Sequence, residues 1–158
     1  PTLFPYTTLF RSILLFIRDT FFVRPRDIPP LDKDYDQQVK SLIEMINHER
    51  QINGLMPLDE IHELNVVALE SARFNYQYYE FTTKPKGLTL QFRLMKQEYP
   101  VFNSGEIIVN LCKNAHEAFG KMKIQLNSRE VMKNGYFCHV GVGKCGNLWT
   151  AIFAQPRY

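Results

Sequence analysis

The histidines and cysteines of this chain could serve metal or nucleophilic chemistry, but their spacing argues against both. His48 and His62 each precede a glutamate, yet neither is followed four residues later by a second histidine, the spacing that puts two zinc ligands on one helix face. Cys138 and His139 are neighbours in a segment patterned as a strand, where consecutive side chains point to opposite faces. We therefore expect no metal site, no metallopeptidase and no Cys–His pair.

The cysteine count leaves the disulfide question open. The chain has three cysteines, which allow at most one internal disulfide. Cys138 and Cys145 could cross-link a terminal hairpin if their side chains share a face and a register, whereas Cys112 could instead meet either of them. All three pairings remain open, and the count does not decide between oxidising and reducing compartments.

Two helices are expected in the first half of the domain. The first spans about 36–52 and ends at Asn53 and Gly54, because glycine readily adopts the left-handed conformation after a helix. Asp59 is expected to cap a second helix that extends to about Tyr79. Apolar or small residues recur on one face of each helix at three- or four-residue spacing: Val39, Leu42, Ile43 and Ile46, then Leu64, Ala68 and Ala72.

The second half changes its periodicity. Residues 88–97 have helical spacing, and 106–109 form a short apolar run that indicates a buried strand. Asn114 with Glu117 matches a capping box that opens a third long helix. Residues 137–142 and 148–154 predict two strands joined by the glycine-containing turn 143–147. This order of elements predicts an α+β layered domain.

Bulk composition favours one globular domain. The 158 residues suit a single core, and 45% hydrophobic residues are enough to build it. The formal net charge is only +3 and the basic residues are scattered, so nucleic acid is not an expected partner.

The N-terminal residues are set apart from the domain. Residues 1–12 lack any apolar period and resemble the translation of a sequencing adapter, so we treat them as non-native. Residues 13–36 comprise a short apolar run, 13–17, and a proline-rich linker. The run is too short to cross a bilayer; it fits a truncated signal peptide, a lost membrane anchor or a strand packed on the domain. The domain is expected at 37–158.

The segment from Asn47 to Leu58, NHERQINGLMPL, carries a family resemblance. Its pattern N-x-x-R-x-x-x-G-L-x-P-L resembles the first-helix signature of the CAP superfamily, which includes cysteine-rich secretory proteins, plant pathogenesis-related proteins and bacterial SCP domains. Later segments agree in order: Leu64, Ala68 and Ala72 at four-residue spacing in the second helix, GEII at 105–108 and HVGVG at 139–143. The resemblance covers about 37–154 and implies a three-layer α-β-α sandwich. Arg50 lies near the helix end, where the dipole favours a cation that can reach a carboxylate.

The resemblance also implies a cleft with two histidines and two acidic residues, which in some members binds a divalent metal. Glu106 matches one acidic position, whereas Gln125 and Ser128 stand where the second acid and the second histidine are expected. Asn103 and Glu130 are expected as cleft neighbours. With both histidines absent, we expect a divergent member with no metal, no cofactor and no catalytic residue.

The leading functional prediction is a secreted, extracellular, non-enzymatic CAP domain whose cleft takes a small or lipid-like ligand, with lipids or sterols as the class the resemblance implies. Membrane contact is expected only through the lost N-terminal segment. One alternative is a protein-interaction or effector module acting through loops 82–87 and 143–147. A weak hydrolase using Glu106 and Ser128 is a further alternative, and it requires a general base within about 3 Å of Ser128.

Overall fold

The computed structural model describes residues 24–158. The predictions for residues 1–12 and for the apolar run 13–17 lie outside the described residues. The elements follow one another as α2 (Tyr35–Ile52), β1 (Asp59–Glu60), α3 (His62–Tyr78), η2 (Pro85–Gly87), α4 (Leu90–Lys96), β2 (Val101–Val109), α5 (Ala115–Ile124), α6 (Leu126–Met132), β3 (His139–Cys145) and β4 (Leu148–Pro156). Within this part of the chain, no helix combines the length and apolarity needed to cross a bilayer.

The four strands of the described chain form one mixed sheet in the order β1-β3-β4-β2. The hairpin β3–β4 supplies the two central strands, and β2 pairs antiparallel with β4 along most of its length. The short β1 runs parallel to β3 at the opposite edge. Strands β3 and β4 are buried almost throughout, because helices cover both faces.

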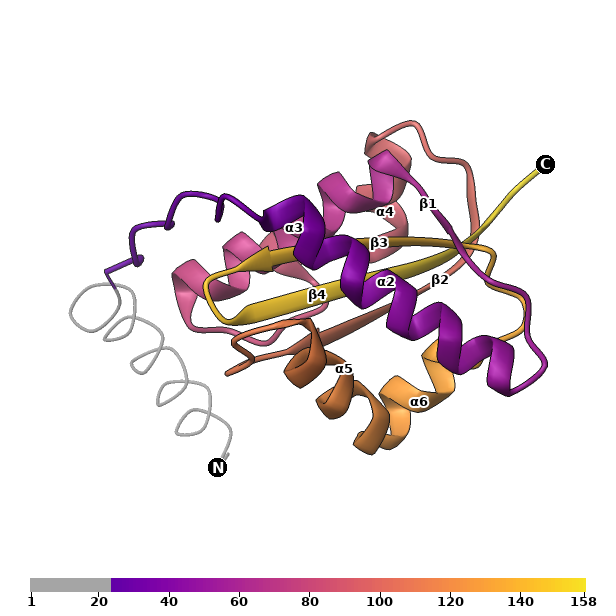
Figure 1. Cartoon of the computed structure of the whole chain (residues 1–158). Helices are drawn as coiled ribbons and strands as arrows, with labels where there is room; N and C mark the ends of the chain where they lie inside the picture. Colours follow the sequence, from indigo (N-terminus) through magenta and orange to yellow (C-terminus); the bar gives the residue numbers. More distant parts are fainter. Residues whose placement is uncertain (1–23) are drawn as a thin grey trace, which may run out of the picture.

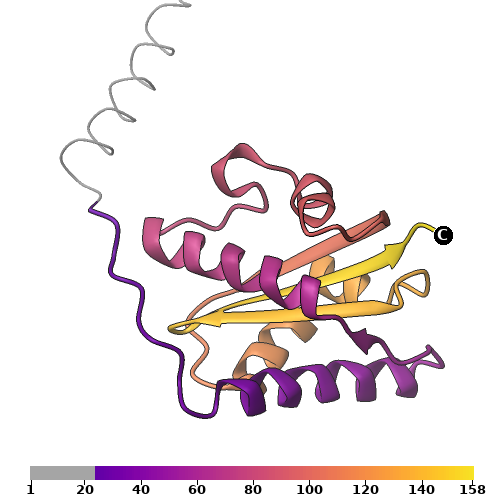
Figure 2. The ribbon, with the colours of Figure 1, turned by 90° about the horizontal axis from the view of Figure 1, so that it is seen from above.

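Figure 2 shows the sheet between two helical layers, with α3 and α4 on one face and α2, α5 and α6 on the other. Each layer has its own apolar cluster. Val140, Val142 and Ala151 pack against α2 and α5, whereas Ile152 and Ala154 pack against α3 and α4. Figure 1 shows the same sandwich from a second direction. The predicted α+β fold with α-β-α layers is confirmed.

The start of the second helix differs from the prediction. Asp59 does not cap that helix; it belongs to β1, where it pairs with His139, and Ile61 occupies the N-cap position of α3. Backbone hydrogen bonds decide the outcome, since Asp59 N donates to Cys138 O and Ile61 N donates to Val140 O. The third long helix is likewise divided into α5 and α6, because Gln125 has an extended backbone at φ −81° and ψ 123°.

Residues 24–34, which we name the N-terminal strap, lie against the domain instead of forming a free linker. Arg26 N donates to Gln77 O, and the Arg26 guanidinium stacks 3.9 Å from the Tyr76 ring centre and 4.0 Å from that of Tyr79. Asp32 forms a 2.7 Å ion pair with Lys144 of β3. These contacts extend the packed unit before residue 37, the start that the sequence predicted.

The three cysteines all lie in the described chain, and none forms a disulfide. Cys138 and Cys145 are seven residues apart along an extended segment, which separates them by about 23 Å at strand rise, far beyond disulfide reach. Cys112 packs in the cluster on the α2 side, whereas Cys145 packs with Ala72 on the α3 side. The proposed hairpin cross-link is therefore not formed.

Candidate functional site

Glu106 lies on the face of the sheet that α3 and α4 cover. It stands opposite Ile152 of β4, whose side chain belongs to the α3–α4 cluster. The next residue, Ile107, belongs to the cluster on the other face, as strand alternation requires. A register shift between Val101 and Asn103 reverses the facing of the strand's first residue, so that Val101 also packs on the α3–α4 side.

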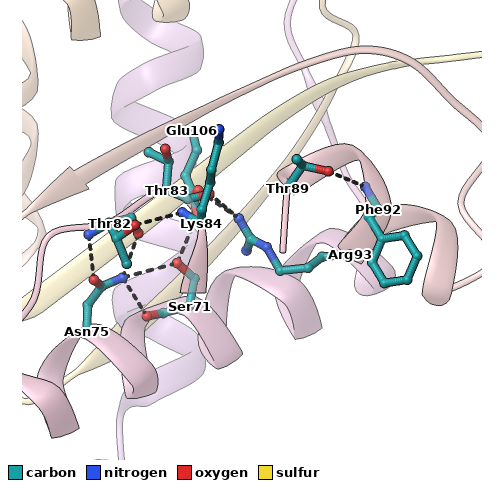
Figure 3. Close-up of polar contacts among 9 residues, drawn as sticks. All are labelled: Ser71, Asn75, Thr82, Thr83, Lys84, Thr89, Phe92, Arg93 and Glu106. Atoms are coloured by element: carbon teal, nitrogen blue, oxygen red, sulfur yellow. Dashed lines mark hydrogen bonds and ion pairs between the residues drawn. The ribbon is translucent and has the colours of Figure 1, made fainter. Parts of the chain in front are cut away.

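Both oxygens of the Glu106 carboxylate are bonded within the protein (Figure 3). Ser71 Oγ of α3 donates to Oε1 at 2.8 Å, and Arg93 Nη2 of α4 donates to Oε2 at 3.1 Å. The side chains of Glu106 and Arg93 are 2% and 7% exposed, so this is a buried ion pair. The net contribution of such a pair to stability is small, because desolvation offsets the attraction.

The same network fixes the loop between α3 and α4. Asn75 accepts a hydrogen bond from Thr82 N at 2.8 Å and donates to Thr82 O at 3.1 Å. Arg93 Nη2 also donates to Thr83 O at 2.8 Å. As Figure 3 shows, the helix α3, this loop, the helix α4 and the strand β2 therefore meet at one set of polar side chains.

Burial raises the pKa of the Glu106 carboxyl above its ordinary value, because desolvation outweighs the opposing effects of Arg93 and Ser71. A carboxyl with a raised pKa inside a pocket is a common feature of functional sites. Here the carboxyl is enclosed by its own partners, and it acts as the centre of the loop-fixing network.

Two cavities adjoin this network. A smaller one, of about 240 Å³, lies at the outer edge of β2, where Thr83 and Thr89 face Ser104, Gly105 and Glu106. A larger one, of about 460 Å³, lies between α3 and α4 and is bordered by η2; we name it the α3–α4 cavity. Its lining combines Arg93 and Ser71 of the network with the rings of Phe74 and Tyr78, whose centres are 4.9 Å apart.

The structure does not gather the predicted cleft residues around Glu106. Gln125 and Ser128 lie at the junction of α5 and α6, in the other helical layer, where Ser128 Oγ donates to Gln125 Oε1 at 3.0 Å. Neither lines the cavity beside Glu106. Asn103 and Glu130 are exposed and also absent from that lining. The sequence resemblance placed Glu106 and Ser128 in one cleft, whereas the sheet separates the two residues.

The residues around Glu106 do not fit a divalent metal. Both carboxylate oxygens are already engaged by Ser71 and Arg93, and the guanidinium would repel a cation at that position. Among residues 24–158, no three His, Cys, Asp or Glu side chains cluster closely enough to hold a metal ion. His139 instead meets the Tyr99 hydroxyl through Nδ1 at 2.7 Å.

Ser71, Asn75 and Arg93 are the site residues that the sequence analysis missed. Ser71 lies beside the alanines of the second helix, a pattern that indicates tight packing and hides a hydroxyl partner. Arg93 lies in a helical segment of seven residues with an exposed charged neighbour, Lys96. Only the placement of α4 over β2 brings it to Glu106, and no sequence spacing reports that contact.

Comparisons with known proteins now identify the fold. No protein-family model and no curated protein sequence matches the chain. Several solved structures do match the chain. An extracellular protein containing an SCP domain from Bacillus anthracis superposes with a TM-score of 0.74 at 20% identity, covering 80% of this chain and 45% of that one. A cysteine-rich secretory protein from Staphylococcus aureus gives a TM-score of 0.69 at 19% identity, covering 80% of this chain and 40% of that one.

An outer surface protein from Borrelia burgdorferi gives a TM-score of 0.74 at 18% identity, covering 83% of this chain and all of that one. The chain therefore has the CAP fold, as the segment from Asn47 to Leu58 led us to expect. It spans less than half the length of the B. anthracis and S. aureus proteins.

Proposed function

We infer that this chain is an extracellular, non-enzymatic binding domain of the CAP type, which holds a small or lipid-like ligand. The observation that carries this proposal is the α3–α4 cavity. Its volume of about 460 Å³ lies in the range of small-molecule sites, and its lining places the rings of Phe74 and Tyr78 beside charged and polar side chains that could orient a ligand.

The extracellular assignment rests on the proteins whose structures resemble this chain. The structurally similar proteins are described as extracellular, secretory and outer-surface proteins. A shared fold establishes neither function nor cellular location, so the extracellular location is proposed together with the function.

The non-enzymatic assignment rests on how the candidate groups are used. Ser128 Oγ donates to the amide oxygen of Gln125, and an amide cannot act as the general base that a serine nucleophile needs. Both carboxylate oxygens of Glu106 already accept hydrogen bonds, from Ser71 and from Arg93. The hydrolase alternative therefore gains no support from either residue.

The alternative of a protein-interaction module loses part of its proposed surface. Gly143, Lys144 and Cys145 are buried residues of β3, and only residues 146–147 form the hairpin turn. The other loop, 82–87, is fixed by Asn75 from within the fold. Phe81, which borders that loop, is 62% exposed.

A direct binding assay tests the proposal. We expect saturable binding of at least one fluorescent amphiphile, either the fatty acid cis-parinaric acid or the sterol dehydroergosterol, measured by fluorescence titration. Leu88→Trp places a bulky ring in the lining of the α3–α4 cavity and should weaken that binding.

Ile124→Trp provides the control, because Ile124 is 78% exposed on α5, in the other layer. It should bind as the unmodified protein does. Absence of saturable binding by a folded sample, or equal affinity in the Leu88→Trp variant, would overturn the assignment of the ligand to this cavity.

A further inference from the structure

The charge around the α3–α4 cavity suggests which ligand it takes. Its lining includes four cations, contributed by α3, η2 and α4: Arg73, Lys86, Arg93 and Lys96. The carboxylates that oppose them are Glu70, which also lines the cavity, and Glu106, which pairs with Arg93. The cationic side chains outnumber the carboxylates by two, so the electrostatic potential of the cavity favours an anion.

Arg93 supplies a specific recognition group within this positive region. Its Nη2 is bonded to Glu106 and Thr83, but Nε and Nη1 are buried with no hydrogen-bond partner among the described residues. Leaving buried donors of a charged group unpaired is costly, so an acceptor is expected at this position. Arg93 as a whole is 6% exposed and belongs to the cavity lining, so the acceptor is expected to come through the cavity.

The remaining lining defines the other part of the ligand. Phe74, Tyr78, Pro85 and Leu88 give the cavity an apolar wall next to the cations. A free inorganic anion would leave this wall without a partner, whereas an anion joined to an apolar body would use both parts.

Building on the function inferred above, we propose that the α3–α4 cavity binds an anionic amphiphile, with its oxyanion head group bonded to Arg93 and its apolar body against Phe74 and Tyr78. The oxyanion is a carboxylate or a phosphate, because both present paired oxygens to a guanidinium. Lys86 and Lys96 are exposed residues of the cavity lining, and their positive charges attract the anionic head group.

Isothermal titration calorimetry with four probes tests this proposal: decanoate, decyl phosphate, neutral decanol and inorganic phosphate. We expect saturable binding of at least one anionic amphiphile, with decanol and inorganic phosphate each at least about tenfold weaker. The Arg93 Nε–H signal in NMR spectra should shift with the amphiphile, and comparison with Arg93→Lys assigns that signal.

Lys86→Gln/Lys96→Gln removes two exposed charges and leaves the buried network intact, so the variant should fold. The affinity of this variant for the anionic amphiphile should be about three- to tenfold lower at low salt. The charge-matched control is Lys40→Gln/Lys113→Gln, which removes two exposed lysines outside the cavity and should change little.

The outcomes separate this proposal from the function on which it rests. Equal binding of decanol and the anionic probes would overturn the anion assignment and leave an amphiphile-binding domain. Phosphate binding as tight as decyl phosphate would overturn the apolar part. If no amphiphile bound to the folded protein, both proposals would fail.

Discussion

Arg50 shows, at the scale of one residue, how this fold uses a buried charge. The side chain is 1% exposed and donates to four backbone carbonyls, those of Met56, Met132, Asn134 and Phe137, at 2.8–3.1 Å. The sequence led us to expect a carboxylate partner; the structure supplies carbonyl dipoles instead. One guanidinium thus joins the end of α2 to the segment that leads from α6 into β3.

Arg50→Met should lower the free energy of unfolding by about 3–5 kcal/mol, because it leaves several buried carbonyls without a donor. Urea denaturation followed by circular dichroism measures the change. Lys40→Met, at an exposed position of the same helix, should change stability by less than about 0.5 kcal/mol. A loss below about 1 kcal/mol in Arg50→Met would contradict the role assigned to Arg50.

The raised pKa of Glu106 predicts how the stability of the protein depends on pH. Folding raises its pKa above the ordinary value of 4.5, so the folded state binds the Glu106 proton more tightly than the unfolded state does. This contribution to stability is complete below 4.5 and is lost as the pH rises through the folded pKa. The unmodified protein should therefore lose stability relative to Glu106→Gln over that window.

The measurement is the difference in unfolding free energy between the two proteins from pH 4 to pH 8. Glu106→Gln has no carboxyl to titrate, and the ion pair with Arg93, which needs the ionised carboxyl, is already included in the pKa of Glu106 that determines the slope. A difference that is constant, or that moves toward the unmodified protein as the pH rises, would show that the ion pair outweighs burial.

At the scale of elements, the close packing of α3 on β3 determines the geometry of the layer that α3 and α4 form. A methyl group at Gly143 would lie 2.3 Å from the Leu69 backbone nitrogen, and one at Gly141 would lie 2.3 Å from the Leu64 carbonyl carbon. No side chain fits between the strand and the helix backbone. The glycines in the HVGVG strand are therefore explained by the close approach of the α3 backbone.

Gly143→Ala should destabilise the protein by about 1–3 kcal/mol or more, because α3 must move away from the sheet to admit the methyl group. Thermal unfolding measures the effect. Gly120→Ala is the matched control: its new methyl would meet nothing within 4 Å, and it lies inside α5, so it should stabilise by about 0.5–1 kcal/mol. Equal effects of the two substitutions would contradict the close approach.

The elements also show which parts of the fold the sequence could predict. Helices α2 and α3 and the β3–β4 hairpin have clear apolar periods, and their predicted limits are close to the observed ones. Strand β1 has two residues, too few to form a period, and depends on backbone bonds to a segment about eighty residues away. The break at Gln125 lacks a proline or glycine signal.

The candidate site divides in the same way. Glu106 lies in a segment that the sequence makes recognisable, whereas Arg93 reaches Glu106 only through the placement of α4. Gln125 and Ser128 were assigned to the cleft by alignment with a family pattern, and the sheet places them in the other layer. Local patterns report elements, but the side-chain contacts between elements depend on tertiary packing.

At the scale of the whole molecule, the N-terminal strap joins parts of the fold that are far apart in the chain. Arg26 reaches the end of α3, and Asp32 reaches Lys144 of the central hairpin, whose side chain is 7% exposed. Tyr35 adds a hydrogen bond from Lys144 N to its hydroxyl oxygen at 3.2 Å. The strap therefore closes the end of the sandwich at which the β3–β4 turn lies.

Arg26→Ala should release the first part of this strap. The substitution removes the stacking on Tyr76 and Tyr79 and the hydrogen bond from Nε to Tyr76 O, which together contribute about 1–2 kcal/mol. Hydrogen–deuterium exchange should therefore speed up at the Arg26 position, whose backbone amide donates to Gln77 O, while β3 and β4 keep their protection. Arg24→Ala, an exposed position two residues earlier, should leave exchange unchanged. Faster exchange in both variants, or in neither, would mean that Arg26 does not hold the strap, and an increase that spread into β4 would make the strap part of the global folding unit.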